Sequence, residues 1–312
     1  MPPIVVPEAL RVNDRETSLQ VVSPAFDIVL YTNHNLSTVS EGILHAYDRF
    51  LTLCPAEELR WYCTETMRKH AACTDRALKL LRQWLRTGAP KRDVICIEIK
   101  GGEHYASTSD FAFWVYGDER GGSYERDAEM VRMCFPSAWG HQRSDEMLDL
   151  ARDLCNHIPF RSGHAGYVLQ TTRYAREKSY TAAWKLARRH PGLDIENELR
   201  DRLAVRDDGI KGVNWITMLC DEFVKRVGGR KKLDASLPKS MEVLPVQGGL
   251  VLKAGAEPSV GDVNRGDRVP LYRSVYRIVA PLQKPAIGRY GPFELPGDAS
   301  EKTDAWLQRF AE

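Results

Sequence analysis

The chain has 312 residues, of which 43% are hydrophobic and 28% are charged, proportions typical of a globular protein with a sizeable core. Its 44 basic and 42 acidic residues give a net charge of +2, which argues against a dedicated nucleic-acid-binding protein. No apolar run is long enough to span a membrane, and the N-terminus lacks the basic and apolar regions of a signal peptide. We therefore expect a cytoplasmic protein without a membrane partner.

Cysteine usage supports the same compartment. The seven cysteines are widely spaced and include no Cys-x-x-Cys pair, and Cys96 lies within the apolar run Val94–Ile99. Such an odd, dispersed set predicts reduced, buried thiols rather than disulfides or a zinc site.

Apolar spacing in the first half predicts strands and helices in alternation. Residues 1–24 contain four prolines and are predicted to form an extended arm with one edge strand at Leu19–Val22. The predicted strands that follow are Phe26–Thr32, Leu59–Thr64, Val94–Ile99, Asp110–Tyr116 and Glu129–Phe135. The predicted helices are Val39–Leu53, Thr74–Thr87 and one opened by Ser144. The last three strands, joined by glycine-containing turns, are expected to form an antiparallel meander.

The second half repeats this mixture around a strand–loop–helix stretch, Gly248–Leu282, which we expect to organise the chain. Its predicted strands are Gly166–Gln170, Met241–Val246 and Leu250–Leu252, the last two forming a hairpin. Its predicted helices are Ser179–Arg189, Met218–Val227, one beginning at Pro270, and Thr303–Phe310.

These elements predict an α+β fold with antiparallel sheets flanked by helices. The expected main domain is residues 25–312, after the arm at 1–24. It forms either one continuous domain or two similar α+β lobes, 25–160 and 161–285, followed by a tail at 286–312.

The sequence offers no catalytic, metal or cofactor motif. No two of the eight histidines stand at i, i+4, and none has a cysteine at zinc-finger spacing. Ser162–Gly166 lacks the Gly-x-Ser-x-Gly order of a nucleophile elbow and is interpreted as a tight turn entering a strand. Asp262, Asn264 and Asp267 could chelate calcium, but their spacing is not that of a calcium loop, and turn formation is favoured.

Several short motifs nevertheless occur in a recognisable order. They are HPGLDI at 190–195, GVNWI at 212–216, GDVNR at 261–265 and VPLY at 269–272, preceded by the strand 111–118 and FPSAW at 135–139. This order resembles the type VI secretion immunity family, over most of residues 25–285.

The resemblance implies an antitoxin that performs no chemistry. Its expected partner is a cognate secreted nuclease toxin, of the restriction-endonuclease-like class that includes the VRR type, which the protein binds in the cytoplasm and keeps from DNA. No catalytic residue, metal, cofactor or direct nucleic-acid contact is implied.

A toxin's DNA groove is basic, so acidic side chains are the natural candidates for binding it. The candidate toxin-binding residues come from the loop 118–127 and the stretch 194–208: Asp118, Glu119, Asp194, Glu196, Glu198, Asp207 and Asp208. These acids are equally compatible with a solvated surface. Sequestration that disrupts toxin assembly, and a metal-independent enzyme acting on small molecules, are the alternatives.

Overall fold

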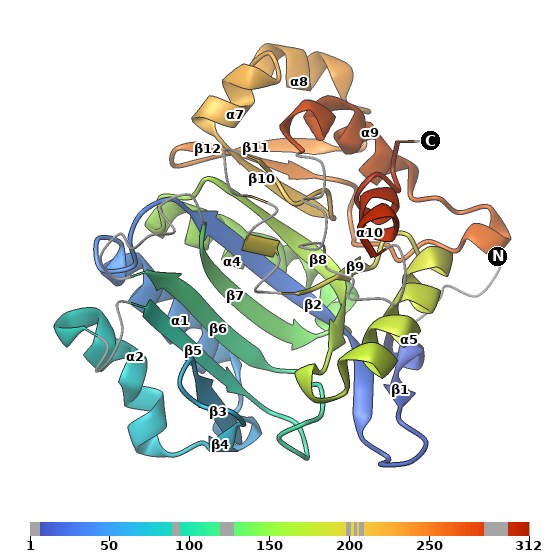
Figure 1. The fold of residues 1–312 in the computed structure, drawn as a ribbon. Coiled ribbons are helices and arrows are strands. Elements are labelled where there is room, and N and C mark those ends of the chain that lie inside the picture. Colours follow the sequence, from blue (N-terminus) through green and yellow to red (C-terminus); the bar gives the residue numbers. More distant parts are fainter. Residues whose placement is uncertain are drawn as a thin grey trace.

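The computed structural model describes residues 7–88, 94–118, 128–197, 201–202, 205, 209–283 and 299–311. Within these residues one sheet of twelve strands forms the centre of the molecule (Figure 1). Its main path runs β11-β12-β10-β8-β2-β7-β6-β5-β3-β4, with β1 paired to β2 and β9 paired to β8. Every pairing is antiparallel except that of β8 with β9, so the predicted α+β class is confirmed.

The strands of this sheet have the following bounds: β1 Val12–Asn13, β2 Gln20–Thr32, β3 Trp61–Thr64, β4 Ala71–Ala72, β5 Val94–Lys100, β6 Ala112–Asp118, β7 Glu129–Pro136, β8 Ser162–Thr171, β9 Asp194–Ile195, β10 Ile216–Cys220, β11 Glu242–Val246 and β12 Gly249–Lys253. The α-helices are α1 Ser40–Leu53, α2 Asp75–Thr87, α3 Trp139–Gln142, α4 Ser144–His157, α5 Arg176–Arg189, α7 Asp221–Arg226, α8 Arg230–Ser236, α9 Pro270–Val279 and α10 Ala299–Leu307. Short 3₁₀ turns occur at Pro7–Leu10, Ala56–Glu58, Arg173–Ala175, Val263–Arg265 and Ala280–Leu282. Each helix within the described part of the chain is too short or too polar to cross a bilayer.

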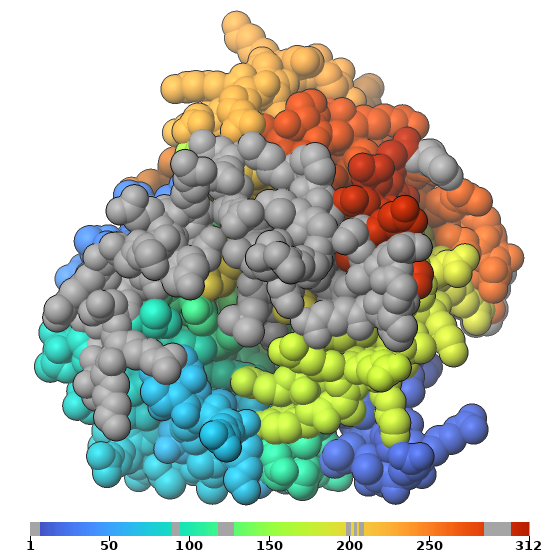
Figure 2. Space-filling view, viewed as in Figure 1, coloured from blue at the N-terminus to red at the C-terminus, as the bar shows by residue number. Residues whose placement is uncertain are grey.

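The two faces of the sheet differ in character because side chains alternate along each strand. On one face, Phe113 of β6 packs against α1. The centroid of its ring lies 5.0 Å from that of Tyr47 and 5.5 Å from that of Phe50. Figure 1 shows α1 and α4 behind the sheet, on this apolar face. The other face is turned toward the viewer, where α5 in yellow-green and α10 in red are seen in Figure 2.

Most predicted elements are confirmed. The meander β5-β6-β7 and the hairpin β11-β12 pair as expected. Helix α2 begins where Thr74 accepts a hydrogen bond from the Ala77 N–H, and ends at Gly88, whose φ of 84° suits glycine. Pro270 occupies the first turn of α9.

The edge strand predicted at Leu19–Val22 is wrong. Gln20 is the first residue of the long central strand β2, which pairs with β8 from Val22 to Tyr31 and with β7 from Ala25 to Thr32. The prolines of this segment suggested an edge strand, because proline cannot donate a hydrogen bond to a neighbouring strand. Pro24 is tolerated in β2 because the pairing with β7 begins only at Ala25, so the hydrogen bonds between β2 and β7 are unaffected.

Two further predictions are also wrong. Met218–Cys220 belongs to strand β10 rather than to a helix, because β8 and β12 flank it and all of its residues are buried. A short apolar run that is buried on both faces has no periodicity to separate strand from helix. Ser162–Gly166 lies within β8 rather than in a turn, and Gly163 allows close packing, since a Cβ there would lie 2.6 Å from the Val29 carbonyl oxygen.

Strands from both sides of residue 160 join the one sheet, with β2 and β8 as neighbours. The boundaries of the arm, lobes and tail stay predictions, and residues 286–298 and 312 of the expected tail lie outside the described residues.

The motifs that carry the family resemblance meet in the structure. His190 Nδ1 donates to the Gly261 carbonyl at 2.7 Å, which joins HPGLDI to GDVNR. Trp215 Nε1 donates to the Gly255 carbonyl at 3.0 Å, and the Tyr272 hydroxyl accepts from the Ser259 N–H at 3.1 Å. These contacts hold the loop between β12 and α9 against the body, so the motifs contribute structural contacts there.

Candidate functional site

Charged side chains gather on the face of the sheet opposite α1 and α4. Strand register places Glu98, Trp114, Arg132, Val29 and His164 opposite one another in a row across β5, β6, β7, β2 and β8. Because residues opposite each other share a face, one row brings an acid, a guanidinium and an imidazole to the same side.

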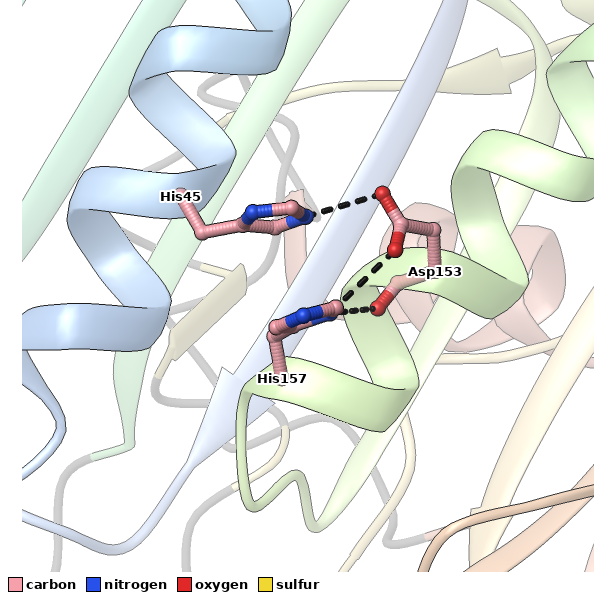
Figure 3. Close-up of side chains that lie close together, drawn as sticks. All are labelled: His45, Asp153 and His157. Carbon is pink, nitrogen blue, oxygen red and sulfur yellow. Dashed lines mark hydrogen bonds and ion pairs between the residues drawn. The ribbon is translucent and has the colours of Figure 1, made fainter.

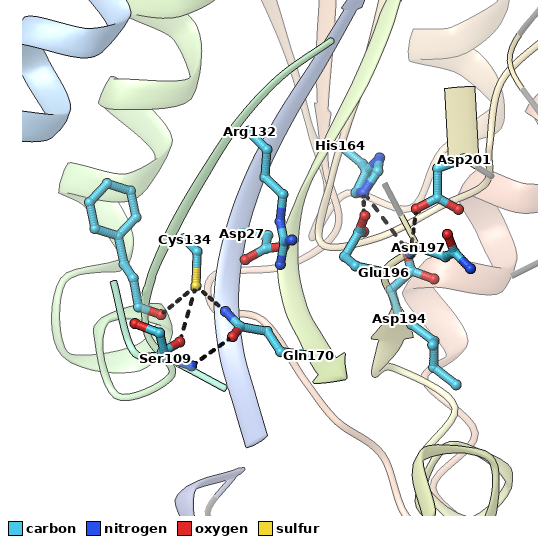
Figure 4. Close-up of polar contacts among 12 residues, drawn as sticks. Asp27, Ser109, Arg132, Cys134, His164, Gln170, Asp194, Glu196, Asn197 and Asp201 are labelled. Carbon is cyan, nitrogen blue, oxygen red and sulfur yellow. Dashed lines mark hydrogen bonds and ion pairs between the residues drawn. The ribbon is translucent and has the colours of Figure 1, made fainter. Parts of the chain in front are cut away.

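A buried network lies beside His164, built from the segment after α5 (Figure 4). The Lys211 ammonium lies 2.8 Å from Asp194 Oδ2, 2.8 Å from Glu196 Oε1 and 2.9 Å from Asp201 Oδ2. His164 Nε2 lies 3.0 Å from Glu196 Oε1. No side chain of these five is more than 8% exposed.

Burial and pairing set the charges of this network. Burial alone would lower the pKa of Lys211, but the three carboxylates around it raise that pKa well above its usual value. Burial would raise the pKa of Glu196, yet Lys211 and the hydrogen bond from His164 bring it well below the usual range. For Asp201 burial prevails over the attraction of Lys211, and the charge of Glu196 reinforces it, so its pKa is well above normal.

The side chains around Lys211 resemble a metal-binding site in which the Lys211 ammonium takes the place of the metal ion. His164, Asp194 and Glu196 bring ligand atoms within 4.8 Å of one another, as a metal site requires. Lys211 Nζ is within hydrogen-bonding distance of both carboxylates, so it neutralises the charge that a metal ion would otherwise neutralise. The network therefore fixes β9 and the following residues to β8.

A second buried ion pair lies on the same face. Arg132 Nε of β7 donates to Asp27 Oδ2 of β2 at 2.6 Å, with the side chains only 6% and 1% exposed. Burial, which Arg132 only partly offsets and Glu196 reinforces, raises the pKa of Asp27 to about 6.

A cavity of about 100 Å³ opens beside these pairs. At its wall His70 Nε2 lies 2.9 Å from Glu98 Oε2, and His70 Nδ1 lies 2.9 Å from the Tyr174 hydroxyl. Arg173 also pairs with Glu98. Burial would raise the pKa of Glu98, but Arg173 and His70 outweigh it, so the pKa falls well below the usual range. A partner at each ring nitrogen ties His70 and its loop to the sheet.

The seven cysteines are free thiols, of which five are buried as predicted, whereas Cys73 and Cys96 are partly exposed. Cys134, beside the Asp27–Arg132 pair, accepts a hydrogen bond from Gln170, and burial raises the pKa of its thiol well above the ordinary value. Burial likewise raises the pKa of Cys155 and Cys96, so these thiols are unreactive at neutral pH.

The structure describes only part of the predicted toxin-binding set. Asp194 and Glu196 are buried in the Lys211 network, so in this structure they do not present their carboxylates to a partner. Asp118 ends β6. Outside the described residues lie the side chain of Asp118 and all of Glu119, Glu198, Asp207 and Asp208.

Four buried charged or titratable residues of this face, Asp27, Arg132, His164 and Lys211, were not predicted from the sequence. Asp27 and Arg132 did carry a signal, because each is a charge inside an apolar strand run, and such charges are seldom buried without a partner. Lys211 and His164 carried none, since their partners approach only through the fold.

The loop Gly261–Arg268 forms turns, as favoured from its sequence. Asp262 Oδ1 accepts from the Asn264 N–H at 3.0 Å, and Asp267 Oδ1 accepts from the Val269 N–H at 3.0 Å. Arg189 pairs with Asp262 at 2.9 Å, which ties the loop to α5. These carboxylates are thus occupied by structural contacts.

A long, mainly antiparallel sheet, with α1 and α4 on its apolar face and α5, α10 and a buried charge network on the other, defines an α+β protein. A family model named TsiV, type VI immunity for VRR-NUC, matches residues 42–310, so the chain belongs to this family. The chain also shares its fold with a solved structure, the Pseudomonas aeruginosa T6SS protein PA0821, with a TM-score of 0.84 and 20% identity over 98% of this chain and 88% of that chain. No curated protein matches the chain.

Proposed function

We propose that this chain is an immunity protein that binds a cognate VRR-type nuclease toxin and neutralises it by covering its active site or DNA groove. The observation that carries the proposal is membership of the type VI immunity family over residues 42–310. The complex forms in the cytoplasm, where such a toxin would meet DNA, and it needs no cofactor.

A binding role without catalysis is consistent with the chemistry of the polar face. Lys211 is surrounded by carboxylates, and His70 has partners at both ring nitrogens. The adjoining cavity of about 100 Å³ is smaller than the roughly 300–1,000 Å³ of typical small-molecule sites, whereas a neighbouring cavity of about 460 Å³, lined in part by Arg11, Gln20 and Asp110, falls within that range.

For the toxin-binding surface we propose the acids Asp118, Glu119, Glu198, Asp207 and Asp208. Acidic groups complement a groove that neutralises phosphates, and they speed association. Asp194 and Glu196 act from inside by anchoring the start of the acidic stretch to Lys211.

Co-expression with the product of the neighbouring toxin gene tests the proposal. We expect a complex that survives affinity purification, and nuclease activity that disappears at one immunity protein per toxin. A catalytically dead toxin that still binds would separate binding from toxicity. The proposal fails if no complex forms and cells expressing the toxin are not protected.

Occlusion and interference with toxin assembly make different predictions. If the immunity protein covers the groove, labelled DNA and immunity protein should compete for the catalytically dead toxin. A ternary complex with DNA would contradict occlusion while leaving the immunity role intact.

A further inference from the structure

A cluster of metal-ligating side chains lies far from the polar face, where α1 meets the end of α4 (Figure 3). His45 of α1 places Nε2 at 2.9 Å from Asp153 Oδ2 of α4. His157, the last residue of α4, places Nδ1 at 3.2 Å from Asp153 Oδ1. The side chains are 30–45% exposed, so an ion can reach them from solvent.

Gly42 creates the close approach that this cluster needs. A Cβ at Gly42 would lie 2.3 Å from the His157 carbonyl oxygen, so only glycine lets α1 come this near to the end of α4. His45 lies one turn further along α1 and is thereby brought against His157, with ring centroids 3.7 Å apart.

We propose that His45, Asp153 and His157 bind one divalent transition-metal ion, with Zn²⁺ as the best fit. Two imidazoles and one carboxylate form a common zinc ligand set, with bonds of about 2.0–2.2 Å. In a tetrahedral site such bonds place ligand atoms about 3.3 Å from one another, close to the 2.9 and 3.2 Å that separate these nitrogens from the Asp153 oxygens. The negative end of α4 favours a cation at this point.

Binding requires rearrangement. In this structure His157 Nδ1 donates to the Asp153 carbonyl oxygen at 2.8 Å, so it must give up that proton and that hydrogen bond to accept the ion. The two rings are stacked within 15° of parallel, so at least one must turn about χ2 to aim its lone pair at the ion, and that torsion is broad. Arg49 Nε lies 3.4 Å from Asp153 Oδ2, and its positive charge opposes the ion. The bound ion would link α1 to α4 and leave a fourth position open to water or to a ligand from a partner.

Calorimetric titration of the chelator-treated full chain with Zn²⁺ tests this site. We expect one ion per chain and a rise in melting temperature, because a ligand that binds the folded state stabilises it. His45→Gln and His157→Gln should each weaken Zn²⁺ binding by more than about tenfold, since even outer-shell changes commonly cost that much. Circular dichroism of each metal-free variant checks that the fold is kept.

Three controls sharpen the result. His34→Gln changes an exposed histidine outside the cluster and should leave Zn²⁺ affinity unchanged. Mg²⁺, which prefers oxygen ligands, should not compete. Arg49→Gln removes the opposing charge and should tighten Zn²⁺ binding by about threefold to tenfold, which a purely structural role for the cluster would not produce.

Absence of Zn²⁺ binding by the wild-type chain overturns the proposal. So does full affinity in either His45→Gln or His157→Gln, because the ion would then be held elsewhere, for example by a half-exposed thiol such as Cys73.

Discussion

At the scale of single residues, Lys211 determines how the interior charges balance. Its ammonium contacts the carboxyl groups of Asp194, Glu196 and Asp201. The only strand that the structure describes in this segment, β9, is two residues long, so these contacts are needed to hold the segment to the sheet. Buried charges are tolerated only when paired, so the network depends strongly on Lys211, with the Arg309 guanidinium 3.7 Å from Asp194 as a second cation.

Lys211→Met should therefore lower the free energy of unfolding by about 3–5 kcal/mol, because it leaves buried carboxylates without their counter-charge. Urea denaturation followed by circular dichroism measures the loss. Lys178→Met is the matched control, since Lys178 is 52% exposed and pairs with Asp14 and Glu16, and exposed ion pairs contribute little to stability. Equal losses in the two variants would contradict the assigned role of Lys211.

Asp27 gives stability a specific pH dependence. Its folded pKa is raised from 3.8 to about 6, so the folded state holds a proton that the unfolded state releases. The stabilisation is complete below pH 4 and is lost as the pH rises through about 6.

Asp27→Asn should remove this dependence. The stability of the wild type relative to the variant should fall by a few kcal/mol, in order of magnitude, between pH 4 and pH 7. Asp14→Asn should show the opposite slope, because a hydrogen bond from Lys178 holds the pKa of Asp14 well below its usual range. Urea denaturation at several pH values measures both, and a pH-independent difference for Asp27→Asn would contradict the argument.

At the scale of secondary-structure elements, the packing of α1 on α4 depends on a contact too close for any side chain. Gly42 faces the backbone of His157 and the side chain of Ile158. The same approach brings together the histidines of the metal site proposed above.

Gly42→Ala should push the helices apart and cost about 1–3 kcal/mol of stability, as overpacking generally does, and it should weaken Zn²⁺ binding as well. Gly212→Ala is the control, because the nearest atom to its Cβ would lie at an ordinary 3.6 Å. Thermal unfolding compares the two variants, and a Gly42→Ala protein as stable as Gly212→Ala would show that α1 shifts without cost.

At the scale of the whole molecule, one sheet carries strands from both halves of the chain, so the surface is presented by a single framework. The Lys211 network anchors the start of the acidic stretch to this framework. The proposed toxin contacts at Asp207 and Asp208 follow that anchor in the sequence.

Reversing both charges, Asp207→Lys with Asp208→Lys, should slow association with the toxin by about tenfold or more and reduce its salt dependence. Stopped-flow or surface-binding kinetics at several salt concentrations measure the effect. The matched control reverses Asp145 and Asp149, two exposed acids of α4, the helix that lies behind the sheet in Figure 1. Unchanged association by the Asp207/Asp208 variant would eliminate this part of the proposed surface.

The sequence by itself determined the elements whose signals are local. The meander, the hairpin β11-β12, the capped helix α2 and the proline-started α9 all follow from spacing, turn residues and caps that act within a few residues. The turn chemistry of Asp262 is local in the same sense.

Only the tertiary structure decided the rest, because the deciding contacts join residues far apart in the chain. Whether Met218–Cys220 is strand or helix depends on β8 and β12, and the central place of β2 depends on both of its neighbours. The local sequence predicts that Asp194 and Glu196 are exposed acids, but in the fold they are buried because Lys211 and His164 pair with them. Charge can be counted in a sequence, but its solvation is set by what the fold places beside it.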